Sequence, residues 1–288
     1  MTRSNLWTAT EIASVTGGRL TGGGDWAITG VSIDSRTLVP GDLFVAIRGP
    51  NADGHDYAAA AADAGAAALL VERKIAGPIP CVVVDDAKAA LAALGRAARG
   101  RTDARIIAIT GSVGKTSTKE ALRYALGRAR PTHASEKSYN NDIGVPLSLA
   151  RMAEDTVYGV FEVGMNHAGE ITPLSRMIRP HLAIITGVEN AHREFFDSIE
   201  AIADAKAEIF AGLEPDGIAI LNRDNPLFGR LEVAARDAGV ARVITFGFAE
   251  DAEVRPIRYS MHDDMSCVTA AVGDVIVTYK VGAPGRHW

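Results

Sequence analysis

The chain has 288 residues, of which 47% are hydrophobic, and its formal net charge is −5. This composition is typical of a globular protein with a sizeable core, and the length favours two domains over one. The acidic balance gives no reason to expect a nucleic-acid partner or membrane insertion, and no apolar run is long enough to span a bilayer.

The first 84 residues are expected to form a small α/β domain. Thr8 to Glu11 matches a capping box, which would open a short helix that ends at Gly17-Gly18. A helix over 87–99 would then lead into a second domain, which we expect to comprise residues 85–288. The other elements predicted for the first domain are strands at 28–33, 43–47, 67–71 and 81–84 and a helix at 57–64.

From residue 104 onward, apolar strand-like runs alternate with helical patterns. This alternation predicts a doubly wound, mainly parallel sheet whose loops form a site at the carboxyl edge of the strands. Gly273-Asp274 separates two further runs, 266–272 and 275–281, which predict a hairpin. The predicted strands are 106–109, 157–163, 182–186, 217–221 and 243–246, and the predicted helices are 118–128, 144–151 and 199–213.

A glycine-rich segment after the 106–109 strand carries the strongest functional signal. It has the form G-x-x-G-K-T and is shorter than the usual P-loop, since Ile109 stands where the first glycine is expected. Backbone N–H groups and a helix N-terminus there would hold phosphate, with Lys115 on the β- and γ-phosphates and Thr116 on Mg²⁺. A structural cap is the alternative. The predicted nucleotide-binding residues are Gly111, Ser112, Val113, Gly114, Lys115, Thr116 and Ser117.

Three ionisable residues that follow this loop in the chain are further candidates for a magnesium–nucleotide site. Glu162 ends a strand, where a carboxylate is costly unless it binds a cation or donors, and a structural ion pair is the alternative. His192 follows the next strand and is either a ligand or an ordinary surface residue. Lys206 lies seven residues after Ile199, on the apolar face of its helix. Burial would favour its neutral amine, which can react with CO₂ to form a carbamate; a lysine that snorkels to water is the alternative.

The two cysteines and the N-terminus bear on the cellular compartment. Cys81 and Cys267 lie far apart in strand-like settings, so we expect buried free thiols rather than a disulfide or a metal pair. The first seven residues lack the apolar run of a signal peptide, so we expect a cytoplasmic protein.

Taken together, these motifs resemble those of the Mur ligases, the ATP-dependent amide ligases that build the peptidoglycan stem peptide. The resemblance extends over nearly the whole chain, and the combination is specific although single motifs are not. The segments that carry it are 34–36, 40–44, 53–55, 110–116, 138–147, 162–171, 191–192 and 205–210.

The resemblance implies roles for individual residues. Lys115, His192 and Lys206 would be catalytic, and Asn222 and Asp224 would lie on the adenine side of ATP, although Asn-Arg-Asp-Asn-Pro is also an ordinary turn. Mg²⁺ would be held by Thr116, Glu162, His192 and carbamoylated Lys206. The implied substrate residues are Ser35, Arg36 and His55 for the uridine diphosphate, with Arg36 as a surface residue in the alternative, and Asn140, Asn141, Asn166 and His167.

The implied reaction joins D-alanyl-D-alanine to UDP-N-acetylmuramoyl-tripeptide, because the Asn140-Asn141 segment and Ser112-Val113 favour that member of the family. The alternatives are the ligase that adds the third stem-peptide residue, a folylpolyglutamate-synthase-like relative and a non-catalytic nucleotide-binding fragment. A P-loop kinase or GTPase is disfavoured by the shortened loop. Gly285 to Trp288 resembles a motif inside the family's central domain. We therefore expect an incomplete central domain, no C-terminal ligase domain, doubtful catalysis by this chain alone, and a monomer.

Overall fold

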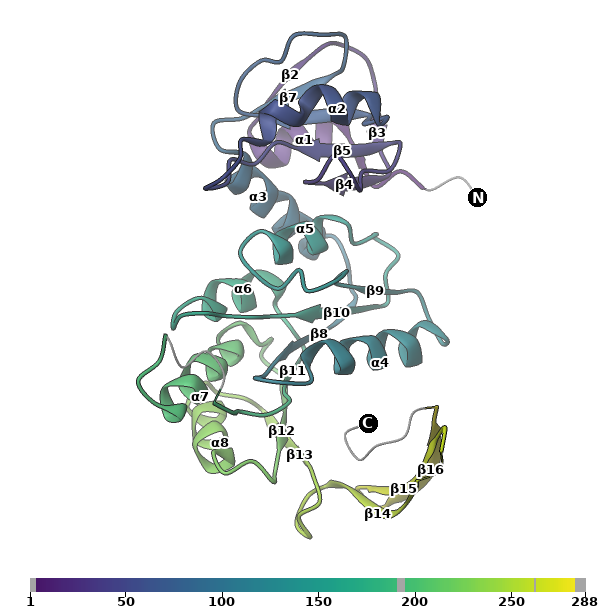
Figure 1. Ribbon diagram of the computed structural model, residues 1–288, viewed down its shortest axis with the longest axis vertical. Helices are drawn as coiled ribbons and strands as arrows, with labels where there is room; N and C mark the ends of the chain where they lie inside the picture. The colour runs from purple at the N-terminus through teal and green to yellow at the C-terminus, as the bar shows by residue number, and fades with distance from the viewer. Residues whose placement is uncertain (1–3, 191–194, 262, 283–288) are drawn as a thin grey trace. The chain divides into compact units, whose positions relative to one another are not determined.

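A computed structural model describes residues 4–190, 195–261 and 263–282 (Figure 1). It contains two compact units, which are treated separately below. Unit 1 comprises Met1–Ile106, Lys119–Val163 and Met177–Arg179, and unit 2 comprises Ile107–Thr118, Gly164–Arg176 and Pro180–Trp288.

Unit 1 is built around a five-stranded sheet with the order β2-β7-β6-β5-β4, in which only β2 is antiparallel to its neighbour. Helix α4 (Lys115–Gly127) belongs to unit 1 except for its first turn. The remaining elements are β1 (Trp7–Thr8), α1 (Ala9–Thr16), β2 (Arg19–Thr21), β3 (Ala27–Ile28), β4 (Gly30–Ser32), β5 (Asp42–Val45), η1 (Gly54–Tyr57), α2 (Ala58–Asp63), β6 (Ala68–Val71), β7 (Cys81–Val83), α3 (Ala87–Gly100), β9 (Thr132–Ala134), α5 (Gly144–Ala150) and β10 (Tyr158–Glu162).

Helices cover both faces of this sheet (Figure 1). Leu43 and Val45 of β5 pack with α1 and α3, whereas Phe44 between them packs with α2. Successive side chains of a strand point to opposite faces, so an unbroken apolar strand requires cover on both sides. Helix α5 joins the same core through Leu147 and Ala150.

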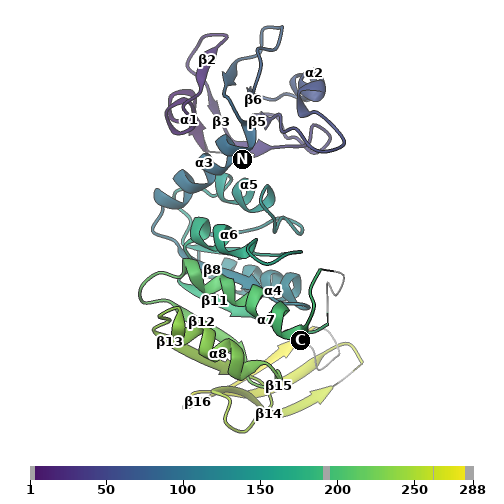
Figure 2. The same cartoon turned by 90° about the vertical axis from the view of Figure 1, so that its left-hand side faces the viewer.

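In unit 2, seven strands follow one another in the order β8-β11-β12-β13-β14-β15-β16. The pairs from β8 to β14 are parallel, and β14, β15 and β16 form an antiparallel meander. Helices α7 and α8 lie side by side (Figure 2). The bounds are β8 (Arg105–Thr110), α6 (Ile171–Ile178), β11 (Leu182–Ile185), α7 (Ile199–Ala207), η2 (Glu208–Gly212), β12 (Ile218–Asn222), α8 (Phe228–Asp237), β13 (Arg242–Phe246), β14 (Val254–Met261), β15 (Ser266–Val272) and β16 (Val275–Val281).

The predicted α/β class and most predicted elements are confirmed, including the hairpin strands at their predicted bounds. The capping box of α1 is present, with Thr8 and Glu11 bonded reciprocally. The strand predicted at 28–33 is wrong as one element, because Ile28 pairs with β1 whereas Val31 pairs with β5. The helices predicted at 57–64 and 199–213 are correct in place, but each is partly 3₁₀. Strands β1, β2, β9 and β14 and helices α6 and α8 were not predicted.

Candidate functional site

The glycine-rich segment forms a tight loop between β8, which ends at Thr110, and α4, which begins at Lys115. Gly111 and Gly114 have φ values of 153° and 80°, a region that favours glycine. The Lys115 ammonium donates a 2.6 Å hydrogen bond to the Gly111 carbonyl. The loop therefore has the compact strand–turn–helix geometry that can present backbone N–H groups and a lysine to an anion.

The backbone that follows β11, residues 186–190, lies against this loop. Thr186 Oγ1 donates to the Val113 carbonyl at 2.5 Å, and Ser112 N donates to the Gly187 carbonyl at 2.9 Å. Ser112 Oγ also donates to the Glu189 carbonyl and accepts from the Glu189 amide. Neither Thr186 nor Glu189 was predicted from the sequence to belong to the site. The pairing of β11 with β8 places Thr186 beside Gly111, because Ile185 is in register with Thr110.

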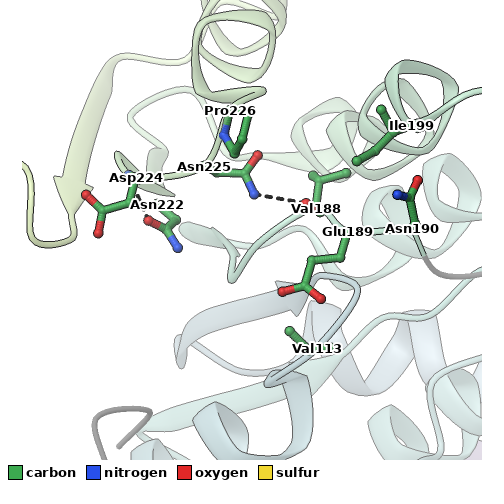
Figure 3. Close-up of a pocket in the computed structure, with 9 residues that line it drawn as sticks. All are labelled: Val113, Val188, Glu189, Asn190, Ile199, Asn222, Asp224, Asn225 and Pro226. Atoms are coloured by element: carbon green, nitrogen blue, oxygen red, sulfur yellow. Dashed lines mark hydrogen bonds between the residues drawn. The ribbon is translucent and has the colours of Figure 1, made fainter.

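A pocket of about 760 Å³ opens beside the loop in unit 2 (Figure 3). Figure 3 shows the Glu189 side chain projecting toward Val113 and the Asp224 carboxylate pointing away from Glu189. That carboxylate accepts hydrogen bonds from Phe248 N and Ala249 N at 2.6 and 2.8 Å, so it caps the turn after β13. The lining residues are Val113, Val188, Glu189, Asn190, Ile199, Asn222, Asp224, Asn225 and Pro226. The pocket thus includes both residues predicted for the adenine side.

Lys206 lies on α7 with only 2% of its surface exposed, as its position on the apolar face predicted. Burial, with a smaller contribution from the nearby positive charge of Lys115, lowers the pKa of its ammonium group to about 8. Withdrawal from water disfavours the charged form of a lysine, and a like charge adds to this effect. A substantial neutral fraction is therefore available near physiological pH.

The loop before α6 carries Asn166 and His167, which are both exposed. His167 Nδ1 lies 3.0 Å from Glu170 Oε1, and the backbone N–H of Asn166 donates to Glu170 Oε2 at 2.8 Å. The N-terminus of α6 is capped by Glu208, whose carboxylate accepts from Gly169 N, Ile171 N and both N and Oγ1 of Thr172. This one carboxylate ties α6 to the 3₁₀ turn that continues α7.

Substituting Glu208 should measure the strength of this cap. We expect Glu208→Gln to lower the free energy of unfolding by about 1–2 kcal/mol, because an amide retains only one acceptor oxygen and loses the charge that favours a helix N-terminus. Urea unfolding followed by circular dichroism would measure the change. Glu232→Gln is the matched control, since Glu232 makes an exposed pair with Arg236 on α8. Equal effects of the two substitutions would contradict the capping role.

Within unit 1, Asn140 and Glu162 are in direct contact. Asn140 Nδ2 donates to Glu162 Oε1 at 2.9 Å, and only 1% of the Glu162 surface is exposed. Asn141 Oδ1 instead accepts from the amides of Ile143 and Gly144, where α5 begins. Asn140 thus orients a buried carboxylate, whereas the Asn141 carbonyl oxygen shapes the local turn.

The residues predicted for the uridine diphosphate differ from one another in exposure and in hydrogen bonding. The Arg36 side chain is 86% exposed and forms a two-point ion pair with Asp34, which holds the pKa of that carboxyl at about 2. His55 is fully buried, with Nδ1 2.5 Å from Asp53 Oδ1 and Nε2 accepting from Glu72 N at 2.8 Å. Ser35 is partly exposed. Both ring nitrogens of His55 are therefore already bonded within the protein, and its role toward the uridine diphosphate stays a prediction.

The remaining sequence predictions concern metals and cysteines. His192 lies outside the described residues. Among residues 4–190, 195–261 and 263–282, no group of three or more His, Cys, Asp or Glu side chains lies close enough together to hold a metal ion. Cys81 is buried and Cys267 is partly exposed, and both are free thiols. In the same part of the chain, no helix is long and apolar enough to cross a membrane.

Comparison with known proteins identifies the family of the chain. Residues 109–288 match the Mur ligase middle domain, and residues 27–101 match the Mur ligase family catalytic domain. The chain belongs to the Mur ligase family. It is 39% identical over 260 residues to a UDP-N-acetylmuramoyl-tripeptide–D-alanyl-D-alanine ligase of Rickettsia prowazekii, a match that covers 90% of this chain and 58% of the relative. The Escherichia coli protein of the same name is 36% identical over 97% of this chain and 61% of its own length.

Solved structures agree with this membership of the Mur ligase family. A crystal structure of MurF from Acinetobacter baumannii superposes with a TM-score of 0.85 at 30% identity, covering 98% of this chain and 61% of that one. MurF ligase from Thermotoga maritima in complex with ADP gives 0.71 at 27% identity, covering 88% and 58%. The chain thus spans about three fifths of the length of its Mur ligase relatives.

Proposed function

We propose that this Mur ligase chain supplies the nucleotide-binding part of an ATP-dependent amide ligase that joins D-alanyl-D-alanine to UDP-N-acetylmuramoyl-tripeptide. The observation that carries the proposal is the geometry of the P-loop, in which Lys115 donates a hydrogen bond to the Gly111 carbonyl. The buried Lys206 lies close enough for the charge of Lys115 to lower its pKa. A relative named for this activity is 39% identical to the chain over 260 residues. Residues 1–84 would bind the uridine nucleotide, and 85–288 would form the central ATP-binding domain.

The reaction has two steps. An oxygen of the tripeptide's terminal carboxylate attacks the γ-phosphorus of ATP, and ADP leaves. The amine of D-alanyl-D-alanine then attacks the acyl phosphate carbon, and phosphate and a proton are lost. Since charge develops on phosphoryl oxygens, the protein's task is positioning and electrostatic stabilisation. The P-loop amides and Lys115 would hold the β- and γ-phosphates, and Asn222 with Asp224 would lie on the adenine side.

The donor chemistry of the chain fits magnesium. Glu162 is a buried carboxylate oriented by the Asn140 amide, and Mg²⁺ prefers such oxygen ligands. Bound Mg²⁺ would neutralise charge on the phosphoryl oxygens. Thr116 and Glu162 would hold one ion, and His192 and carbamoylated Lys206 a second. In a complete enzyme, Lys206→Ala would then abolish activity, and short carboxylates would partly restore it.

The proposed substrate residues fall into two groups, one for the uridine diphosphate and one for the rest of the substrate. Ser35, Arg36 and His55 would form the site for the uridine diphosphate, and the ring of His55 is oriented by its bond to Asp53. Asn166 and His167 would lie on the substrate side, because their side chains are exposed. Asn140 and Asn141 would contribute on the same side through their turn. The protein would act as a cytoplasmic monomer with small-molecule substrates.

Calorimetric titration with UDP-N-acetylmuramoyl-tripeptide tests this proposal, with the corresponding dipeptide as control. Tripeptide preference would support the D-alanyl-D-alanine-adding activity. Dipeptide preference would favour the ligase that adds the third residue, whose solved relative shares the fold at 16% identity. A folded protein that binds neither would favour a non-catalytic fragment. A folylpolyglutamate-synthase-like activity has only fold-level support, also at about 16% identity.

A further inference from the structure

The P-loop is held on one side by backbone and side chain from outside its own motif. Residues 186–190 follow β11, and Thr186 is the first of them. Its hydroxyl donates to the Val113 carbonyl at 2.5 Å and also lies 3.3 Å from the Thr110 carbonyl. Thr186 N donates to the same Thr110 carbonyl at 3.0 Å. Thr186 thus contacts the loop at both its start and its middle.

These contacts fix the orientation of two peptide groups in the loop. In a planar trans peptide, the C=O of one residue and the N–H of the next point in opposite directions. Ser112 N points to the Gly187 carbonyl, so the Gly111 carbonyl must point the other way, where Lys115 Nζ meets it at 2.6 Å. The N–H of the Gly111–Ser112 peptide is therefore bonded to the segment after β11, and its C=O is bonded to Lys115.

The second peptide group follows the same rule. The Val113 carbonyl points to the Thr186 hydroxyl, so the Gly114 N–H must point away from Thr186. Backbone N–H groups at this part of a P-loop are the donors that cradle phosphate. Without the hydroxyl, the Val113 carbonyl would lose its donor, and the peptide could rotate to aim its oxygen toward a bound anion.

Close packing limits how the hydroxyl can sit. A Cβ placed on Gly111 would be only 1.9 Å from Thr186 Oγ1. The hydroxyl can therefore occupy this position only because residue 111 has no side chain. Gly111 and Thr186 are therefore a matched pair.

We propose that Thr186 is a positioning residue for phosphate binding: its hydroxyl holds the Val113–Gly114 peptide so that the N–H faces the phosphate. The inference rests on the proposed ATP site but concerns a residue outside the P-loop motif. Thr186 touches no phosphate itself, and acts through the peptide that does.

Titration with ADP and Mg²⁺ on the full chain tests the proposal, comparing Thr186→Val with Thr186→Ser. Valine keeps the shape and removes the hydroxyl, so we expect about tenfold weaker ADP binding, as for a lost hydrogen bond that leaves its acceptor unpaired. Serine keeps the hydroxyl and should bind within about twofold of the wild type. Adenosine, which has no phosphate, should bind all three proteins alike, which a general loss of structure would not produce.

Thr245→Val is the matched control, since Thr245 lies on β13 and its hydroxyl accepts a hydrogen bond from Glu253 N. It should leave ADP binding unchanged. If Thr186→Val does not fold by circular dichroism, Thr186→Ala takes its place, because it adds no methyl beside Gly111. Wild-type affinity for ADP in the hydroxyl-free variant would overturn the inference while leaving the ATP site intact. A folded wild type that does not bind ADP would overturn the proposed function and this inference with it.

Discussion

Gly111→Ala should weaken ADP binding about a hundredfold while leaving the rest of the fold in place. The new Cβ would lie 1.9 Å from Thr186 Oγ1 and 3.3 Å from the Gly187 carbonyl, and a φ of 153° is strained for alanine. Strain of this kind costs about 1–3 kcal/mol at one residue, and the loop can relieve it only by leaving Thr186. We therefore expect affinity to fall by about two orders of magnitude, measured by calorimetric titration with ADP.

The control for this prediction is another glycine of unit 2. Gly229 lies on helix α8, and a Cβ there would meet nothing within 4 Å. Gly229→Ala should leave ADP binding unchanged and stabilise the protein by up to about 1 kcal/mol, since alanine loses less backbone entropy in a helix. If Gly111→Ala bound ADP as tightly as Gly229→Ala, the compact loop would not be the binding conformation.

Local sequence patterns predicted the features that depend on neighbours in the chain. The spacing of apolar residues around Lys206 indicated a buried lysine, because helix periodicity places position 206 over Ile199. The G-x-x-G-K-T pattern indicated the tight turn after β8 in the same way. The split between β3 and β4 was missed because each half pairs with a different distant strand, β1 or β5.

Contacts between distant residues could not be predicted in this way. Thr186 follows an unremarkable apolar strand, and its role depends on register with β8, more than 70 residues earlier. Glu208 lies within the helix predicted at 199–213, but its carboxylate caps a different helix, which begins at Ile171. His55 lies among polar residues typical of a binding loop, and only the fold shows that Asp53 and Glu72 already occupy its ring nitrogens.

Lys206→Met should stabilise the protein by about 3 kcal/mol at pH 7, and this gain should shrink as the pH rises above 8. The pKa of Lys206 is lowered from 10.5 to about 8, chiefly by burial, so the folded state holds the charged form at a cost of about 3 kcal/mol. Between about pH 8 and 10.5 the unfolded chain binds the proton more tightly, so wild-type stability rises with pH and approaches that of the variant. Urea unfolding at pH 7 and 9.5 in CO₂-free buffer measures the difference in free energy of unfolding between the variant and the wild type at each pH.

Lys74→Met is the control, because Lys74 is exposed and the substitution should change stability by less than about 0.5 kcal/mol at either pH. If Lys206→Met were more stable than the wild type by the same amount at both pH values, the lowered pKa of Lys206 would be contradicted. The same neutral amine explains why Lys206 is the site proposed for a carbamate. Isotopically labelled bicarbonate should therefore give a carbamate NMR signal in the wild type and in Lys74→Met, but not in Lys206→Met. A signal of equal strength in all three proteins would assign the carbamate to another amine and leave Lys206 a buried lysine without that modification.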